Sequence, residues 1–289
     1  MSLVEDARLL LSEAAFRLTG NTDFPVSVRL VCQSLNVRIR RRPDLKAALL
    51  VNAGEAPEVL LPARHKSTNF LPNTKTQSLR CLASAQRDHR DSWDRYLVAH
   101  ELGHFVLHRA RHGKPLGKSE YWLQEELCDS FARWLLLPQK AIEKWSSTKA
   151  QSFRHTPVEN LVLPALELSS ELQRTAHVPW EIAATRLSEC SPNIGFLTIR
   201  EHDGRRLRVT ASTLDRRKEI GRLIRKSSNL GSLLIRQNKA DFISISADLF
   251  AGFQSLPRIS VGAAQRMSAT QWHIALGFSQ WKSLSVALI

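Results

Sequence analysis

Apolar residues recur every three or four positions in several segments of the first half of the chain, and this spacing places them on one face of an α-helix. The pattern predicts helices over residues 4–18, 25–35, 94–112 and 123–137. Shorter segments of alternating or continuous apolar residues predict strands over 37–41, 48–52 and 58–62. The polar segment 64–84 has no clear period and predicts an extended loop.

The pattern changes in the second half of the chain, after a polar connection at 144–159. Residues 161–190 predict two short helices, with Pro179 in the first turn of the second. Beyond Pro192 the period becomes two, and the Asp203-Gly204 pair between two alternating segments predicts a β-hairpin. The remaining segments predict a basic helix over 214–226, strands at 242–246 and 259–261, and a final helix over 263–276.

These elements and the length of 289 residues predict an α+β protein with more than one domain. The changes of pattern divide the chain into an N-terminal part, a helical segment and a C-terminal α+β part, at residues 1–145, 146–191 and 192–289. A composition of 43% hydrophobic and 24% charged residues, with 12 Gly and 12 Pro, is that of a folded protein and excludes collagen-like or disordered chains.

The distribution of apolar residues and cysteines also indicates the cellular compartment in which the protein works. No run approaches the roughly 18 apolar residues that a membrane span needs, and acidic residues interrupt the leucines near the N-terminus, unlike a signal peptide. We therefore expect a cytoplasmic protein with no membrane partner. Four widely spaced cysteines without a C-x-x-C pair predict reduced thiols, and they predict neither disulfides nor a thiolate zinc site.

The formal net charge is +14, and the basic excess is spread over both halves of the chain. Its densest clusters lie at 38–42 and 216–226. Such a balance is typical of proteins that meet nucleic acids or acidic partners, and equally of a solvated basic surface. The charge alone does not choose between these two interpretations.

The sequence His100-Glu101-Leu102-Gly103-His104 lies in the third predicted helix. Residues four apart share a helix face, so the two imidazoles can bind one cation while Glu101 reaches water beside it. Two surface or core histidines remain the alternative, because a five-residue motif also arises by chance. A three-histidine site is excluded, because position 110, where a third ligand would stand, is Ala.

A catalytic zinc site needs a third protein ligand and one open position. Glu125 and Asp129, about 20 residues downstream, are four apart and share a helix face. The spacing favours Glu125 as the third ligand, with Asp129 holding a metal-binding histidine through its other ring nitrogen. Glu126 points about 100° away from that face. An ordinary preference for acidic residues near a helix start explains the carboxylates, but it does not explain their spacing.

The segment from Arg95 to His108, R-Y-L-V-A-H-E-L-G-H-F-V-L-H, resembles the R-F-T-L-A-H-E-L-G-H-x-x-L-H signature of the ImmA/IrrE family of zinc metallopeptidase-like proteins. Glu125 to Pro138 is similar to that family's E-x-x-A-[ND]-x-F-A-x-x-L-L-M-P, and Pro25 to Arg38 to its opening segment. Two residues depart from the family pattern: Cys128 replaces the usual Ala, and Asn36 replaces the usual Gly. Both lie at positions expected to serve packing or a turn.

The resemblance implies a zincin-like metallopeptidase domain with Zn²⁺ bound by His100, His104 and Glu125, and Glu101 as the base. It also implies a protein substrate, a helix-turn-helix transcriptional repressor whose cleavage derepresses stress-response or mobile-element genes. Residues 166–190 resemble a helix-turn-helix-like segment that often follows this domain, and some long family members then carry a GAF-like sensor domain.

Two functions from different classes follow. The first is a zinc-dependent endopeptidase with a C-terminal regulatory region. The second is a DNA-binding transcriptional regulator in which the zinc site is structural or vestigial. The second helix of the pair supports DNA binding weakly, because Glu181 and Glu189 outnumber Arg186 on a surface that would meet phosphates.

Overall fold

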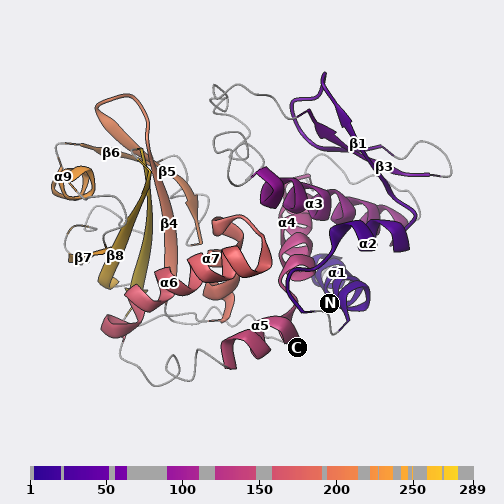
Figure 1. Ribbon diagram of the computed structural model, residues 1–289, viewed down its shortest axis with the longest axis horizontal. Helices are drawn as coiled ribbons and strands as arrows, with labels where there is room; N and C mark the ends of the chain where they lie inside the picture. The colour runs from indigo at the N-terminus through magenta and orange to yellow at the C-terminus, as the bar shows by residue number, and fades with distance from the viewer. Residues whose placement is uncertain are drawn as a thin grey trace. The chain divides into compact units, whose positions relative to one another are not determined.

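The structure is a computed structural model. It describes residues 3–20, 23–51, 56–63, 90–110, 121–147, 158–190, 194–213, 222–226, 228–236, 242–246, 249, 259–268 and 270–278. Contacts group the chain into two compact units (Figure 1), one of residues 1–148 with 174–179, the other of residues 149–173 with 180–289. The chain is α+β, as the sequence predicts.

The first unit combines helices with one small sheet. Its helices are α1 (Leu3–Thr19), α2 (Val28–Ser34), α3 (Arg90–Ala110), α4 (Tyr121–Leu136) and α5 (Gln139–Ser147). Its strands are β1 (Arg38–Arg42), β2 (Leu49–Val51) and β3 (Glu58–Pro62). The strand order is β1-β3-β2, with β3 parallel to β1 and antiparallel to β2. All the helices and strands predicted for residues 4–62 and 94–137 are present, with small shifts at their ends.

Local chemistry fixes where these elements begin and end. The Ser27 hydroxyl caps α2 by accepting a hydrogen bond from the Leu30 amide at 3.4 Å. Gly20 follows α1 at φ +55, a left-handed conformation that costs glycine little. Helix α4 ends shortly before Pro138, which cannot continue a helix.

Helices α3 and α4 form the centre of the first unit. Tyr96 and Leu102 of α3 and Phe131 of α4 are fully buried, as is Leu11 of α1. At the crossing, a Cβ atom built on Gly103 would lie 3.0 Å from the Cys128 Cα and 3.1 Å from its Cβ. The absence of a side chain at Gly103 therefore lets the two helix backbones approach closely.

The second unit contains a six-stranded antiparallel sheet in the order β6-β5-β4-β9-β8-β7. The strands are β4 (Ile194–Glu201), β5 (Arg206–Ser212), β6 (Leu223–Arg225), β7 (Phe242–Ser246), β8 (Ile259–Ser268) and β9 (Gln271–Phe278). The helices are α6 (Val158–Ala176), whose last turn falls in the first unit, α7 (Trp180–Cys190) and α9 (Asn229–Arg236). The β4–β5 hairpin around Asp203 and Gly204 and the strand β7 confirm the corresponding predictions.

Both faces of this sheet are covered with apolar residues along part of their length. Leu197, Ile199 and Val209 pack with Leu230 and Leu234 of α9 on one face. Phe196 and Ala275 pack with α6 and α7 on the other. Figure 1 shows α9 close to β6, and α6 and α7 beside β4. A sheet buried on both faces yields strands with continuous apolar runs.

This two-sided burial explains the clearest error of the sequence analysis. The final helix predicted over 263–276 is wrong, because these residues form the β8–β9 hairpin. All eight residues of β9 are buried, so the alternation that marks a half-exposed strand is missing. The end of the basic helix predicted over 214–226 is also wrong, since Leu223–Arg225 is strand β6, while 214–221 lies outside the described residues.

Other expectations are tested only in part. The loop predicted over 64–84 lies outside the described residues, and α5 extends to Ser147 into the predicted connection at 144–159. The division at 1–145, 146–191 and 192–289 stays a prediction about independent folding. Among the described residues Cys32 and Cys128 are buried free thiols and Cys190 is exposed. No described helix combines the length and apolarity needed to span a membrane.

The close approach at Gly103 generates a prediction about stability. Gly103→Ala adds a methyl group against the backbone of α4, and it should destabilise the protein by about 1–2 kcal/mol, because overpacking outweighs the gain in helix propensity. Thermal unfolding of the metal-free protein measures this. A variant with an unchanged or higher thermal midpoint would show that α3 and α4 separate without cost.

Candidate metal centre

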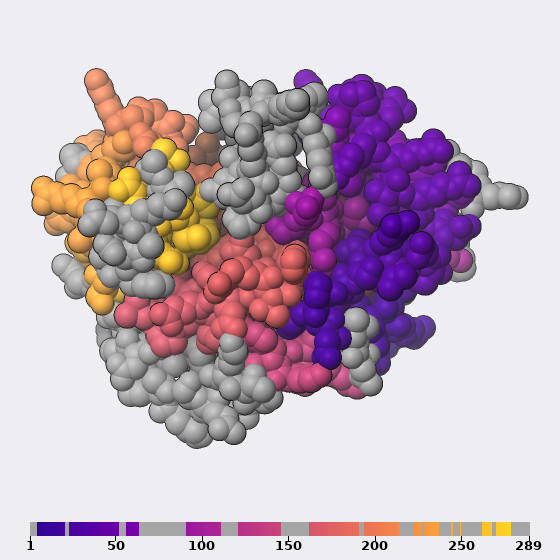
Figure 2. All heavy atoms as spheres, viewed as in Figure 1, coloured from indigo at the N-terminus to yellow at the C-terminus, as the bar shows by residue number. Residues whose placement is uncertain are grey.

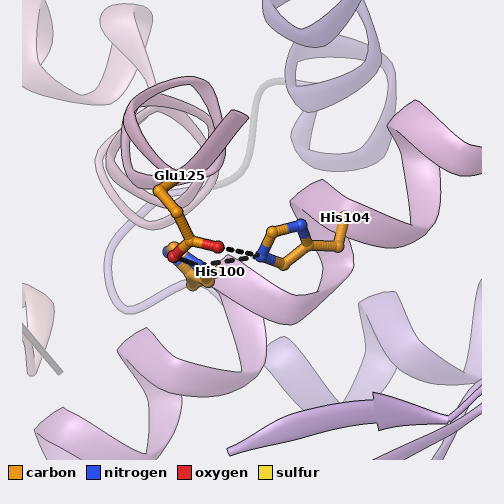
Figure 3. Close-up of side chains that lie close together, drawn as sticks. All are labelled: His100, His104 and Glu125. Carbon is orange, nitrogen blue, oxygen red and sulfur yellow. Dashed lines mark hydrogen bonds and ion pairs between the residues drawn. The ribbon is translucent and has the colours of Figure 1, made fainter. Parts of the chain in front are cut away.

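Three side chains from two helices converge in the first unit (Figure 3). His100 and His104 lie one turn apart on α3, and Glu125 reaches them from α4. The Nε2 atoms of His100 and His104 are 3.1 Å apart. Glu125 Oε2 lies 3.5 Å from His100 Nε2, and Glu125 Oε1 lies 3.3 Å from His104 Nε2. Together the three residues form a potential metal-binding triad.

The separations of these ligand atoms test whether a metal fits. Nitrogen and oxygen ligands at about 2.0–2.1 Å from a tetrahedral metal ion lie about 3.3–3.4 Å from one another. The two imidazole nitrogens are 3.1 Å apart, and each lies 3.3–3.5 Å from a different oxygen of Glu125, close to that value. A donor set of two imidazoles and one carboxylate, with one ligand atom from each residue within 4.8 Å of the others, is of the kind that binds a divalent cation.

A second set of side chains orients the histidines. The Asp129 carboxylate oxygen Oδ1 lies 2.7 Å from Nδ1 of His100 and also accepts a hydrogen bond from the Tyr96 hydroxyl. A neutral His100 that donates from Nδ1 has its Nε2 lone pair directed at the cluster. The side-chain nitrogen Nε2 of Gln124 lies 2.9 Å from Nδ1 of His104. With the amide oxygen on that side, Gln124 would orient His104 in the same way.

The site is buried at its base and more open on one side. The His100 side chain is fully buried, whereas that of His104 is 16% exposed. Burial raises the pKa of Asp129, but the hydrogen bonds from His100 and Tyr96 and nearby positive charge together hold this pKa below its ordinary value. Asp129 therefore stays ionised and can accept a hydrogen bond from Nδ1–H of His100.

Glu101 lies beside the triad without belonging to it. Its side chain is buried, and its Oε2 accepts a hydrogen bond of 3.0 Å from the backbone amide of Leu50 in β2. Strand β2 is at the edge of the small sheet. The contact fixes this carboxylate between α3 and the sheet. Glu101 directly follows His100, a candidate metal ligand.

The structure brings together the residues that the sequence analysis selected and separates those it set aside. His100, His104 and Glu125 form the cluster, and Asp129 contacts His100. Glu126 is exposed, as its position on the other side of α4 predicts. Their roles toward a metal stay predictions.

Sequence reasoning missed two contributors, Tyr96 and Gln124. Tyr96 stands one turn before His100 on the same helix face, a signal that the spacing rule could have used. Gln124 precedes Glu125 directly, and residues adjacent on a helix point in different directions. Only the packing of α4 on α3 places both Gln124 and Glu125 near the histidines.

Comparison with known proteins finds similarity to solved structures. No family model matches the chain, and no curated protein is similar to it. A solved structure described as a Mycobacterium tuberculosis transcriptional regulator is similar, with 12% sequence identity and a TM-score of 0.50. The match covers 96% of this chain and 82% of that one. At this identity the similarity shows the fold alone.

The adjacent carboxylates of α4 allow a matched test of the site. Glu125→Ala removes a charged ligand and should lower the affinity for Zn²⁺ or Co²⁺ by orders of magnitude, whereas Glu126→Ala should leave it nearly unchanged. Asp129→Asn should lower it about 10- to 100-fold, as losses of orienting partners do. Metal content after dialysis against graded chelator measures all three. Equal losses of metal in Glu125→Ala and Glu126→Ala would contradict the assignment of Glu125 as a metal ligand.

Proposed function

We propose that this protein is a zinc-dependent endopeptidase. The observation that carries the proposal is the convergence of His100, His104 and Glu125, a set of three protein ligands of the kind found at catalytic zinc sites. Structural zinc sites are closed by four protein ligands, whereas catalytic sites keep a position for water or substrate. The described residues near the triad offer no cysteine or histidine as a fourth ligand.

In peptide hydrolysis, different residues of the chain would bind the metal, orient its ligands and transfer protons. His100, His104 and Glu125 would hold the metal, Asp129 would orient His100, and Gln124, with its amide oxygen toward Nδ1, would orient His104. A bound zinc ion supplies Lewis acidity toward a carbonyl oxygen and makes water more acidic. The Glu101 carboxylate accepts the proton of the attacking water and transfers it to the leaving amine nitrogen.

The position of Glu101 supports that role. It follows His100 directly on α3, and the Leu50 amide holds one of its oxygens. That hydrogen bond fixes the orientation of the carboxylate that would act as the general base.

For the substrate we propose a helix-turn-helix transcriptional repressor. The support is the resemblance of three separated segments to the ImmA/IrrE family, two of which hold Glu101 and the three ligand residues. The similar structure described as a transcriptional regulator fits a task in transcriptional control. We expect cleavage of the repressor to release genes for stress response or mobile-element transfer.

A second candidate is a transcriptional regulator that binds DNA and uses the metal only for stability. The similar structure's description favours it directly, and the formal charge of +14 is compatible with contact to phosphates. Against it, α7 exposes Glu189 and buries Arg186, which is paired with Glu189 at 2.7 Å. That helix therefore offers little positive surface to DNA.

Glu101→Gln tests the peptidase mechanism. The amide keeps the shape of the side chain and cannot accept the proton, so we expect unchanged zinc content and a loss of cleavage of at least about 100-fold. Cleavage of repressor is followed by mass spectrometry of the fragments. Glu126→Gln is the control, because it makes the same chemical change on an exposed position and should keep full activity. Undiminished cleavage by Glu101→Gln would contradict the mechanism.

The two candidate functions differ in their response to salt. A DNA-binding regulator should bind duplex DNA with an affinity that falls steeply as salt rises, and it should leave the repressor intact. The peptidase should shorten the repressor, and Glu125→Ala should abolish this. Intact repressor together with salt-sensitive duplex binding, unchanged in Glu101→Gln, would favour the regulator.

A further inference from the structure

One face of the six-stranded sheet carries four arginines on three adjacent strands. Ile199, Val209 and Ile224 point into the core beneath α9. Because side chains alternate along a strand, the neighbouring residues Arg200 of β4, Arg206 and Arg208 of β5 and Arg225 of β6 lie on the opposite face. We call these four residues the arginine face. Figure 2 shows the β4–β5 hairpin at the surface of this unit.

The register places these arginines directly opposite one another. Arg200 is paired with Arg208, and Arg206 with Arg225. Side chains of directly paired residues on one face lie about 4.5–5.5 Å apart at Cβ, and like charges at that spacing destabilise a sheet. Two such pairs side by side need compensating negative charge.

The described residues provide only part of that compensation. Asp203 accepts a hydrogen bond of 2.6 Å from Nε of Arg206, and the buried Glu181 acts electrostatically on Arg200. Within the described ranges, the guanidinium groups of Arg208 and Arg225 form no ion pair or side-chain hydrogen bond. The four arginines and two carboxylates leave an excess of two positive charges.

Buried polar atoms next to the arginines also lack partners. The Nε atoms of Arg200 and Arg208 are buried without a hydrogen bond. The Thr198 hydroxyl, two residues before Arg200 on the same face, is fully buried and likewise has none. Buried polar groups normally have partners, so three neighbouring exceptions mark a place where a ligand or ordered solvent completes the structure.

From this geometry we infer that the arginine face binds the phosphate group of a small phosphorylated molecule. A phosphate monoester carries about 1.5–2 negative charges at pH 7 and three acceptor oxygens, which matches the excess charge and the unpartnered donors. A single carboxylate would neutralise only half of the excess. Arg200 and Arg208 are half-buried, which favours a small ligand over a nucleic-acid backbone. The site requires no metal and would make this unit a sensor of a phosphorylated metabolite.

The test is calorimetric titration of the full chain, at constant ionic strength, with AMP, inorganic phosphate, citrate and duplex DNA. We expect AMP to bind with one site per chain and inorganic phosphate to compete with it. Arg208→Gln should weaken AMP binding about tenfold or more, since it removes a charged hydrogen-bond donor. Arg236→Gln, an exposed arginine of α9 away from this face, is the control and should change nothing.

Stability measurements keep the test decisive. Without phosphate, Arg208→Gln should unfold at the same temperature as the parent or higher, because a like-charge contact is removed. Added phosphate should raise the unfolding temperature of the parent protein more than that of the variant. If Arg208→Gln fails to fold, the exposed Arg225→Gln provides the same comparison. Absence of saturable AMP binding, equal weakening by Arg236→Gln, or binding of citrate or duplex DNA alone would each overturn the assignment.

Discussion

The close packing of α3 against α4 is the contact on which the cluster of His100, His104 and Glu125 depends. The two histidines and Glu125 lie 21 to 25 residues apart in the chain, and they meet because the backbones approach at Gly103 and Cys128. Fully buried residues on both helices, including Leu102, Phe131 and Leu135, stabilise this approach. The apolar packing therefore supplies the free energy that holds a cluster of polar groups away from water.

Burial in turn requires that these polar groups be paired. Tyr96 and His100 both bond to Asp129, and the His100 side chain has no exposed surface. Because the carboxylate has protein partners on both sides, it can stay ionised in an apolar surrounding and fix the imidazole. The edge strand β2 contributes by the same principle, since the Leu50 amide satisfies one oxygen of Glu101. A rigid, preorganised site follows from the need to satisfy each buried group.

In the second unit, one face of the sheet is apolar along part of its length and basic along the rest. Helices cover its sheet on both faces, but the apolar cover on the α6–α7 face includes Phe196 and Ala275 and does not extend to Arg200. Beyond Thr198 the same face changes from apolar to strongly basic within two residues of one strand. One sheet thus combines a stable core with a charged surface, because alternation along each strand keeps the two sets of side chains apart.

Helical periodicity is a local property, so the α+β class, the helices that carry the motif and the position of Glu125, and not Glu126, beside the histidines were predictable from the residues alone. Reasoning from the sequence misassigned 263–276, since a strand buried on both faces lacks the alternation that distinguishes it from a helix. The contacts of Gln124 and Leu50 with the site, and the pairing of arginines on neighbouring strands, became visible only in the folded chain. These contacts depend on how helices cross and how strands register, and no local pattern encodes either.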